Sequence, residues 1–421
     1  MTSKPREIFV YIQLPGATES VTCGRLTWQR LRTGEPVGDF VYGQSYRARR
    51  DALPIDPINL PVGAGQRRSI LYGGLFGALR DASPDAWGRR VIERSLARTD
   101  LDGPDYLLNS PEDRAGALSF GLGAVPPSPV RDFNRTLELA ALLDAARRIE
   151  DDLPAAIGAG LEVGTSMGGA RPKAVVRDDE RLWLAKFPSR GDRWNNARVE
   201  HAMLTLAAEC GVRCPTHRIE RIGDDDVLLI ERFDRSPVKA GGEERLPSFP
   251  RHRMVSALTV LGCDESERDR WSYPQLATEL RRWVKDPKRD AAELFRRMVF
   301  NALISNTDDH PRNHALIAPA TDWHLSPVYD LTPAPSHSQE RDLAMRVGTW
   351  HRRASRANLM SHFSYFQLSR EDAAHIIDEL HGIVSTRWRH HLVEAGVTVS
   401  DCERVASAFV PPGFGFAVPS A

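Results

Sequence analysis

The sequence predicts an α+β protein with a small β-rich N-terminal domain and a mostly helical C-terminal lobe. Apolar residues alternate at Ile8, Val10 and Ile12 and are followed by Gly and Thr, a pattern typical of short strands and turns. Towards the C-terminus the apolar spacing is helical, and helices are expected at about 274–286, 291–305, 370–380 and 383–395. A chain of 421 residues can form two or three domains with hydrophobic cores.

The composition is that of an ordinary soluble globular protein, with 41% hydrophobic residues and 56 basic against 56 acidic residues. A net charge near zero argues against a surface coated by nucleic acid. The five cysteines are scattered and odd in number, so no disulfide framework is expected, and Cys210 and Cys214 lack a second pair at a zinc-like spacing. The N-terminus has no apolar run of signal-peptide length and no 18 apolar residues run uninterrupted, so we expect a cytoplasmic protein without membrane contact.

The first predicted domain covers residues 1–128. SPDAWGRRVIERSLAR (83–98) predicts a helix that Ser83 caps, with Pro84 in its first turn. GALSFGLGAV (116–125) reads as a strand, and the proline-rich VPPSPV after it marks the first boundary.

Two further regions are predicted at 129–235 and 236–421. The elements expected in the first of them are a helix at 137–150, a glycine-rich stretch at 158–169, a hairpin of KAVVR and RLWLAKF, a helix at 194–210 and a strand at 225–235. Residues 238–249 are expected to form an exposed loop.

The stretch NALISNTDDHPRNHALI (301–317) places polar residues between two segments that look buried, where polar side chains are costly unless paired or facing a cleft. Asp308 and Asn313 are five residues apart, the offset of the D-x-x-x-x-N catalytic loop of protein kinases. There the Asp accepts the substrate hydroxyl proton and the Asn holds Mg²⁺. Asp309 is only four residues from Asn313, so the spacing favours Asp308; a plain turn is the alternative.

A second acid follows in HLSPVYDLTPA, where Asp330 comes directly after an apolar pair. Magnesium prefers few carboxylates together with phosphates and waters. Asp330 is therefore the candidate for a second protein ligand of a phosphate-bound Mg²⁺.

A strand lysine and a helix glutamate form the upstream half of the candidate site. Alternation places Leu182, Leu184 and Lys186 on one face, and an ammonium at the end of an apolar face is costly unless it meets an anion. A kinase-type lysine meets nucleotide phosphates and a helix glutamate, for which Glu200 is the candidate. Glu200 shares its helix face with Met203, Leu204 and Ala207. The alternative is that Lys186 reaches solvent and Glu200 lies at the flank.

The glycine-rich stretch GTSMGGARPK (164–173) offers backbone N–H groups near Gly168 and Gly169 that suit phosphate oxygens. Ser166, Arg171 and Lys173 add a hydroxyl and two cations. A tight turn before the strand is the alternative reading.

The order of these parts favours a protein-kinase-like bilobal fold that uses ATP and Mg²⁺. The parts of such a fold follow one another in the same order: the glycine-rich stretch, the strand lysine, the helix glutamate, an apolar strand with its charged exit at Glu231, the Asp–x₄–Asn pair and the last Asp. Glu231 is grouped with the cofactor-binding candidates on this ground.

The segments GTSMGGARPKA, LAKFP, LLIERFDR, NTDDHPRN and VYDLTPA, in this order, resemble the HipA-type serine/threonine kinases, the toxins of bacterial toxin–antitoxin pairs. SPDAWGRRVIER and DRAGALSF resemble the small N-terminal domain of that family. The resemblance implies roles for the following residues: Asp308 as catalytic base, His310 as an orienting residue, Asn313 and Asp330 as Mg²⁺ ligands, Lys186 at the ATP phosphates, and Ser166 as an inhibitory autophosphorylation site.

The resemblance also implies partners: a protein substrate such as an aminoacyl-tRNA synthetase, and a small helix-turn-helix antitoxin that binds operator DNA. Two features depart from the pattern. Asp309 is often glycine or basic in relatives, so this extra acid is expected to affect metal or substrate binding. The basic run RVGTWHRRASR (346–356) is either a contact for substrate, nucleic acid or antitoxin, or a solvated face.

Two alternatives to a protein kinase toxin stay open at the level of sequence. Small-molecule phosphotransferases such as antibiotic kinases use a similar Asp–x₄–Asn loop. A degenerate kinase fold acting as a catalytically silent corepressor is the non-enzymatic alternative.

Overall fold

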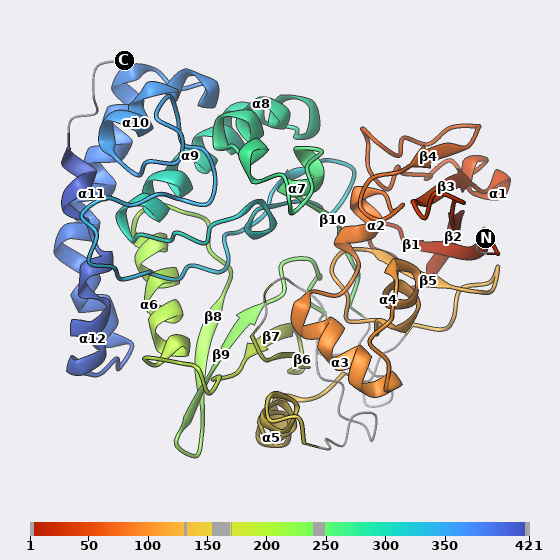
Figure 1. The fold of residues 1–421 in the computed structure, drawn as a ribbon, viewed down its shortest axis with the longest axis horizontal. Helices are drawn as coiled ribbons and strands as arrows, with labels where there is room; N and C mark the ends of the chain where they lie inside the picture. Colours follow the sequence, from red (N-terminus) through yellow and green to blue (C-terminus); the bar gives the residue numbers. More distant parts are fainter. Residues whose placement is uncertain (1–3, 130–132, 154–168, 170, 239–248, 417–421) are drawn as a thin grey trace. The chain divides into compact units, whose positions relative to one another are not determined.

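The computed structural model describes residues 4–129, 133–153, 169, 171–238 and 249–416 (Figure 1). The chain forms two compact units. Unit 1 consists of Met1–Ser189, Glu231–Val255 and Ile317–Trp323, and unit 2 consists of Arg190–Ile230, Ser256–Leu316 and His324–Ala421. The domain boundaries expected after residues 128 and 235 follow a different division and stay predictions.

Unit 1 begins with a five-stranded antiparallel sheet in the order β4-β3-β2-β1-β5. Its strands are β1 (Arg6–Gln13), β2 (Ser20–Arg30), β3 (Pro36–Tyr42), β4 (Arg67–Ser69) and β5 (Leu118–Gly121). Ile8, Val10 and Ile12 are fully buried, so the alternation in the sequence does mark the inner face of β1. The strand expected at 116–125 is present as the shorter β5.

The helices of unit 1 are α1 (Gln44–Arg47), α2 (Gly77–Asp81), α3 (Ala86–Leu96), α4 (Gly103–Asn109), the 3-10 turn η1 (Thr136–Glu138) and α5 (Leu139–Glu150). The expected helix at 83–98 is confirmed as α3, but the prediction that Ser83 caps it is wrong. Asp85 is the N-cap, and its side chain accepts a hydrogen bond from the backbone N–H of Gly88 at 2.7 Å. A carboxylate at this position also complements the helix dipole.

The predicted hairpin is present as the antiparallel pair β6 (Lys173–Arg177) and β7 (Leu182–Lys186). One face of it packs in a small core made of Phe133, Val175, Leu182, Leu184 and Phe249. At the start of β6 the Lys173 ammonium lies 2.6 Å from Asp85 Oδ2, and both side chains are buried. The cap of α3 and the entry to β6 are thus joined by one buried ion pair.

A buried network of charged residues joins the segment DRAGALSF (113–120) to the segment RFDR (232–235). The Asp234 carboxylate accepts from Arg232 at 2.8 and 2.9 Å, from Arg235 at 2.6 Å and from the backbone N–H of Gly116 at 2.9 Å. Arg251 donates to the carbonyls of Gly116 and Leu118 at 2.8 and 2.9 Å. Burial alone would raise the pKa of Asp234, but the charges of Arg232 and Arg235 hold that pKa well below its usual value.

Unit 2 is mostly helical. Its helices and 3-10 turns are α6 (Asn196–Glu209), α7 (Ala257–Val260), η2 (Arg268–Arg270), α8 (Tyr273–Trp283), α9 (Pro287–Leu303), η3 (Pro311–Asn313), α10 (Arg356–Ser361), η4 (Phe363–Phe366), α11 (Arg370–Glu394), α12 (Val399–Val405), η5 (Ala406–Ala408) and η6 (Pro412–Gly415). The remaining strands of the chain are β8 (His217–Ile222), β9 (Asp225–Glu231), β10 (Arg253–Ser256), β11 (Ala315–Ala318) and β12 (His324–Leu325). The chain passes between the units after Ser189, at the end of β9, at the end of β10, within β11 and after Trp323, directly before β12.

The long helix α11 packs against α6 and α9 (Figure 1). The prediction of two helices at 370–380 and 383–395 is wrong, because the helix continues through Gly382 without a break. Arg387 pairs with Glu209 of α6 at 3.1 Å, and Glu379 pairs with Arg296 of α9 at 2.8 Å. These contacts on both sides of Gly382 support one continuous element.

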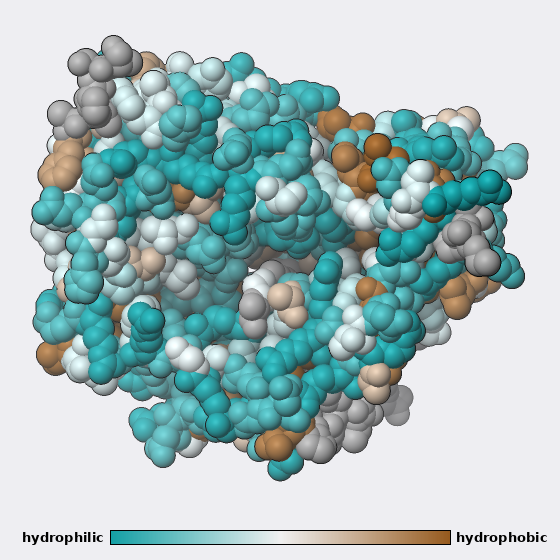
Figure 2. All heavy atoms as spheres, in the orientation of Figure 1, coloured by the Kyte–Doolittle hydropathy of each residue, from teal (hydrophilic) through white to brown (hydrophobic). Residues whose placement is uncertain are grey.

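The predicted α+β class is confirmed. Polar side chains dominate the face drawn in Figure 2. Within the described ranges, no helix has the length and apolar character needed to cross a membrane. The loop expected at 238–249 lies largely outside the described residues.

We predict that Asp234→Asn destabilises the protein strongly, because it leaves two buried guanidinium groups without their counter-charge. A loss of roughly 3–5 kcal/mol is expected for breaking such a buried pair. Urea unfolding followed by circular dichroism measures it. The matched control is Asp224→Asn, whose side chain is fully exposed in the β8–β9 turn and should shift the midpoint little. Equal midpoints for the two variants would contradict the role of the network.

Candidate active site

The polar loop after α9 is built around a buried carboxylate. Asp309 is 2% exposed, and its Oδ2 accepts hydrogen bonds from the Tyr273 hydroxyl and from His314 Nε2, the latter at 2.8 Å. Burial, and next the charge of Asp309, raise the pKa of Tyr273 well above its usual value. The hydroxyl therefore stays protonated at physiological pH and remains a donor.

Two buried asparagines extend this arrangement to the segment of Asp330. Asn301 Nδ2 donates to the Tyr273 hydroxyl oxygen at 3.4 Å, and Asn306 Nδ2 donates to Asn301 Oδ1 at 3.1 Å. The same amide of Asn306 donates to the backbone carbonyl of Asp330 at 3.2 Å. A continuous series of hydrogen bonds thus joins Asp309 to Asp330 within unit 2.

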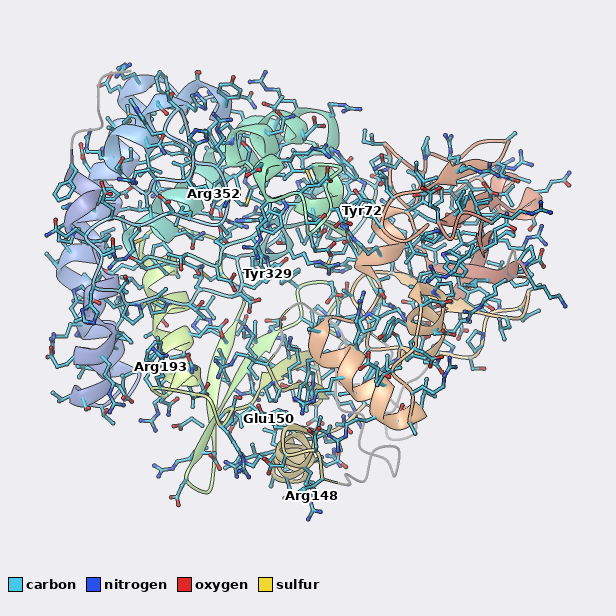
Figure 3. The ribbon with its side chains drawn as sticks, viewed as in Figure 1. Tyr72, Arg148, Glu150, Arg193, Tyr329 and Arg352 are labelled. Atoms are coloured by element: carbon cyan, nitrogen blue, oxygen red, sulfur yellow. The ribbon has the colours of Figure 1, made fainter. Side chains whose placement is uncertain are left out.

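Further contacts fix the two segments beside each other. The Tyr329 hydroxyl, labelled in Figure 3, donates to the carbonyl of Arg312 at 2.7 Å, and Ala334 N–H donates to the carbonyl of Ser305 at 3.1 Å. Asp330 has a φ of +57°, in the left-handed region that residues with a side chain rarely adopt. Such strain persists only where the surroundings over-determine the backbone, and it is common at functional sites.

Asp308 differs sharply from its neighbour. It is exposed, and within the described residues its carboxylate takes part in no hydrogen bond or ion pair. Its backbone carbonyl, in contrast, accepts from the N–H of His310 at 2.8 Å and from Asn313 Nδ2 at 3.3 Å. The chain therefore presents a free carboxylate on a fixed backbone, as a general base requires.

Asn313 and His310 complete the loop. Asn313 is 5% exposed and uses its Nδ2 to bind Asp308, which leaves its amide oxygen without a hydrogen bond in the described part of the chain. His310 precedes η3, and its ring stands edge-on to Trp271 with 6.4 Å between the ring centroids. The orienting role expected of His310 stays a prediction.

The donors in unit 2 fit a magnesium ion that is bound sparsely by protein. Among the described residues, no three His, Cys, Asp or Glu side chains gather as a metal site. The amide oxygen of Asn313 and the carboxylate of Asp330 are nevertheless oxygen donors of the type that Mg²⁺ takes when phosphates and waters supply its other ligands.

The candidates upstream lie in unit 1. Lys186 is the last residue of β7 and is half-buried, and Glu231 ends β9 with its carboxylate 3.4 Å from Arg181. Gly169 has a φ of +99°, and its carbonyl accepts from the Lys173 ammonium at 3.2 Å. Gly168 and Ser166 lie outside the described residues. Their predicted roles and those of Lys186 and Glu231 stay predictions.

One expectation about a charged residue is wrong. Lys173 was expected to add a cation for phosphate, but it is 2% exposed and paired with Asp85. Asp309 was expected to affect metal or substrate binding. Its carboxylate is buried and accepts hydrogen bonds from Tyr273 and His314, and the expected effect stays a prediction.

Glu200 lies in unit 2 on α6 and is 6% exposed, with Met203, Leu204 and Ala207 buried on the same side. The helix face expected from the sequence is therefore confirmed. Its pairing with Lys186 stays a prediction.

The residues that hold the loop could not be identified from the sequence pattern. Asn301 and Asn306 read as ordinary polar residues at a helix end, and Tyr273 stands 36 residues before Asp309 in the chain. His314 offered the only local signal, as a histidine at the edge of an apolar segment.

The family model of the HipA-like C-terminal domain matches residues 165–388, which is more than half of the chain. The chain belongs to the HipA family. HipA of Shewanella oneidensis MR-1, from a structure of the toxin–antitoxin complex with HipB and operator DNA, has a TM-score of 0.68. That match covers 95% of this chain and 94% of the other at 18% sequence identity, so the two share a fold.

Two curated relatives carry the name of a kinase. Y4dM of Sinorhizobium fredii is 28% identical over 180 residues, and a protein of Haemophilus influenzae is 24% identical over 188 residues. The matches cover 38% and 40% of this chain, and 40% and 52% of those relatives. The chain thus matches about half of their length or less.

We predict that Tyr273→Phe loosens the loop, because Asp309 loses one of its two donors while staying buried. An unsatisfied buried acceptor costs about 1–3 kcal/mol. Thermal unfolding measures the loss, and hydrogen exchange of amides 305–314 localises it. Tyr365→Phe, at an exposed tyrosine, is the control. Unchanged stability and unchanged exchange in Tyr273→Phe would show that Asp309 does not depend on this hydroxyl.

Proposed function

We propose that this chain is an ATP-dependent serine/threonine protein kinase of the HipA type that acts as the toxin of a toxin–antitoxin pair. The observation that carries the proposal is the contrast within one loop of unit 2. Asp309 is buried and bound by Tyr273 and His314, while the adjacent Asp308 is exposed and unpaired. Membership of the HipA family and the kinase names of the two relatives support it.

In this proposal Asp308 takes the proton of an incoming hydroxyl group, and the hydrogen bonds to its carbonyl hold it in place. Asn313 and Asp330 hold Mg²⁺ through one amide and one carboxylate oxygen. Bound ATP with Mg²⁺ supplies the phosphoryl group and the charge that stabilises its transfer. Lys186 binds the ATP phosphates and pairs with Glu200, and Gly168, Gly169 and Glu231 complete the nucleotide contacts.

We further propose that Ser166 is an autophosphorylation site. A phosphate there would add nearly two negative charges within the glycine-rich stretch, where nucleotide phosphates are proposed to bind. Like-charge repulsion would then oppose nucleotide binding, so the modification would inhibit the kinase.

The proposed partners are a HipB-like helix-turn-helix antitoxin, operator DNA through that antitoxin, and a protein substrate of the translation machinery such as an aminoacyl-tRNA synthetase. The antitoxin and the DNA are supported by the fold shared with a HipA that was solved with HipB and operator DNA. The substrate rests on the family resemblance. The cytoplasm is the proposed compartment.

We predict that Asp308→Ala and Asp330→Ala each lower phosphate transfer from γ-labelled ATP by about 10²–10⁴-fold, the usual contribution of a positioned base or of comparable catalytic groups. Autophosphorylation and labelling of a cell lysate are the measurements, with circular dichroism to confirm folding. Asp224→Ala, at the exposed β8–β9 turn, should transfer phosphate at the wild-type rate. Wild-type labelling by Asp308→Ala would refute the role of the base. Rapid phosphorylation of an aminoglycoside without any labelled protein would favour the small-molecule alternative.

We predict that Lys186→Ala weakens ATP binding about tenfold, because hydrogen bonds to charged groups contribute about 1.5–3 kcal/mol. Calorimetric titration with a non-hydrolysable ATP analogue measures the dissociation constant. The matched control is Lys288→Ala, at an exposed lysine of α9. An unchanged ATP affinity in Lys186→Ala would contradict the assignment.

A further inference from the structure

Most of the basic run at 346–356 lies in a hydrogen-bonded turn of unit 2. Residues 341–354 fold back on themselves: Leu343 N–H donates to the carbonyl of Arg352 at 2.9 Å, and Val347 N–H donates to that of His351 at 2.7 Å. His351, at the turn, has a φ of +51° in the left-handed region. A non-glycine residue held there is strained, and strain of this kind is often found where a side chain has a task.

A buried asparagine holds the turn. Asn358 is fully buried, its Nδ2 donates to the carbonyls of Trp350, His351 and Arg353, and its Oδ1 accepts from the N–H of Trp350 at 2.9 Å. At Gly348 an added Cβ would lie 2.1 Å from Ser361 Oγ and 2.5 Å from the carbonyl of Asn358. The backbone of the turn is therefore closely determined, and its side chains are presented in a fixed arrangement.

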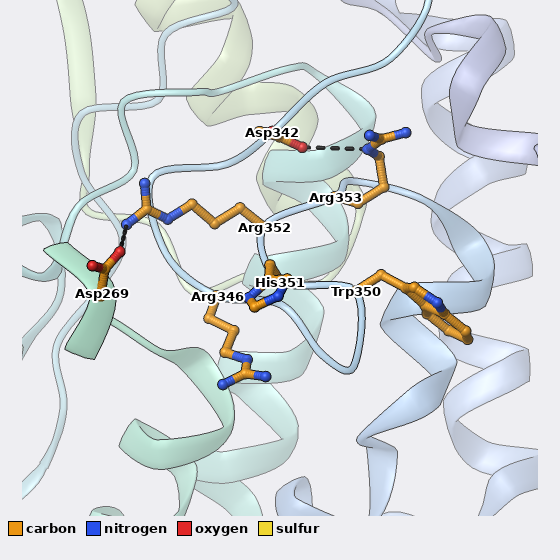
Figure 4. Close-up of a pocket in the computed structure, with 7 residues that line it drawn as sticks. All are labelled: Asp269, Asp342, Arg346, Trp350, His351, Arg352 and Arg353. Carbon is orange, nitrogen blue, oxygen red and sulfur yellow. Dashed lines mark hydrogen bonds and ion pairs between the residues drawn. The ribbon is translucent and has the colours of Figure 1, made fainter. Parts of the chain in front are cut away.

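The turn lines a cavity of about 580 Å³ (Figure 4). Its lining consists of Asp269, Asp342, Arg346, Trp350, His351, Arg352 and Arg353. Arg353 is engaged by Asp342 at 3.3 Å and by Glu340, so its charge is balanced. Arg352 donates to the backbone carbonyl of Arg268 at 2.6 Å and pairs at 3.6 Å with Asp269, whose side chain is fully exposed.

Arg346 is different, since no carboxylate pairs with it in the described part of the chain. Its Nε donates to the carbonyl of Gly348 at 3.2 Å, which fixes the side chain and leaves both terminal amino groups for a ligand. Figure 4 draws ion pairs for Arg352 and Arg353 and none for Arg346. His351 is exposed beside it. The cavity thus holds a fixed guanidinium group whose charge is not balanced, which suits one carboxylate or phosphate group.

The cavity adjoins the proposed catalytic loop. The backbone N–H of Arg346 donates to the carbonyl of Trp271 at 2.8 Å, and the backbone N–H of Tyr273 donates to the carbonyl of Arg346 at 3.0 Å. Trp271 contacts the ring of His310, and the Tyr273 hydroxyl donates to Asp309. Arg346 is therefore separated from the Asp308 loop by a single segment of chain.

We propose that this cavity binds an anionic side chain of the protein substrate, with Arg346 as the main contact and His351 as a second donor. The inference rests on the proposed kinase function and names a specificity site for it. A carboxylate and a phosphorylated hydroxyl group share the required chemistry. Nucleic acid fits less well, because only one arginine is unbalanced, whereas a phosphate backbone requires several cations.

The test measures binding without phosphate transfer. The probes are fluorescein-labelled peptides that contain one serine in a neutral background. Each peptide carries a glutamate, a phosphoserine or an alanine near that serine. Fluorescence anisotropy gives their dissociation constants at low and high salt. We expect the wild-type protein to bind the glutamate or the phosphoserine peptide more tightly than the alanine peptide. Arg346→Gln should remove most of that preference, about tenfold in affinity. Which of the two anionic peptides binds more tightly identifies the ligand.

Four further variants make the result specific. Arg346→Lys keeps the charge and should restore part of the preference, and His351→Gln should reduce it without removing the bond from Arg346 to Gly348. Arg356→Gln is the matched control, since Arg356 belongs to the same basic run but pairs with Asp378 at 2.8 Å outside the cavity. Asp308→Ala should keep the wild-type preference for the anionic peptides while its phosphate transfer falls as predicted above, so failure of the kinase proposal and failure of the cavity proposal are separable.

The proposal is overturned if the wild type binds the alanine peptide as tightly as both anionic peptides. It is also overturned if Arg346→Gln and His351→Gln both keep the wild-type preference. Binding of a labelled single-stranded RNA that is lost in Arg346→Gln, while peptide binding is unchanged, would assign the cavity to nucleic acid instead.

Discussion

The buried carboxylate of Asp309 is the constraint on which the candidate site depends. A carboxylate can be buried only if its oxygens are satisfied, and Tyr273 and His314 supply the donors. Through Tyr273, Asn301 and Asn306 the same hydrogen bonds reach the backbone of Asp330. Because every member of this series is buried or bound on both sides, the loop cannot shift without leaving a polar group unpaired. The exposed Asp308 therefore stands on a turn whose backbone is held by buried hydrogen bonds.

In unit 1 the buried charges that must be satisfied are mainly cationic side chains. Arg232, Arg235 and Arg251 are buried around Asp234 and the carbonyls of the DRAGALSF segment. Lys173 is buried against Asp85, which also caps α3. Buried ion pairs contribute little net stability but are costly to break, so they specify which segments lie together. In this unit they join α3 to β6, and the segment around Gly116 to the segments that follow β9 and precede β10.

The sequence predicted what depends on periodicity and spacing. Alternation identified β1 and the β6–β7 hairpin, and helical spacing identified α3, α6 and the buried face of Glu200. The Asp308–Asn313 offset selected Asp308 over Asp309 as the candidate base; Asp308 is the exposed acid of the two, and its role stays a prediction. Spacing carries no information on long-range partners, so the contacts from Asp309 to Tyr273 and from Lys173 to Asp85 could not be predicted. The break expected in α11 was wrong because packing against α6 and α9 overrode the local effect of Gly382.

Tyr273 connects the candidate catalytic loop of unit 2 to the basic cavity. Its hydroxyl donates to Asp309 in the loop, and its backbone N–H donates to the backbone carbonyl of Arg346 at the edge of the cavity. The first residue of α8 thus sets the separation between the free carboxylate of Asp308 and an anionic group bound at Arg346. A polypeptide held in the cavity would bring to Asp308 only those hydroxyl groups that lie at a matching distance along its chain. Selection of the acceptor residue would then follow from the geometry at the first residue of α8, because hydrogen bonds hold both Asp308 and Arg346 in place.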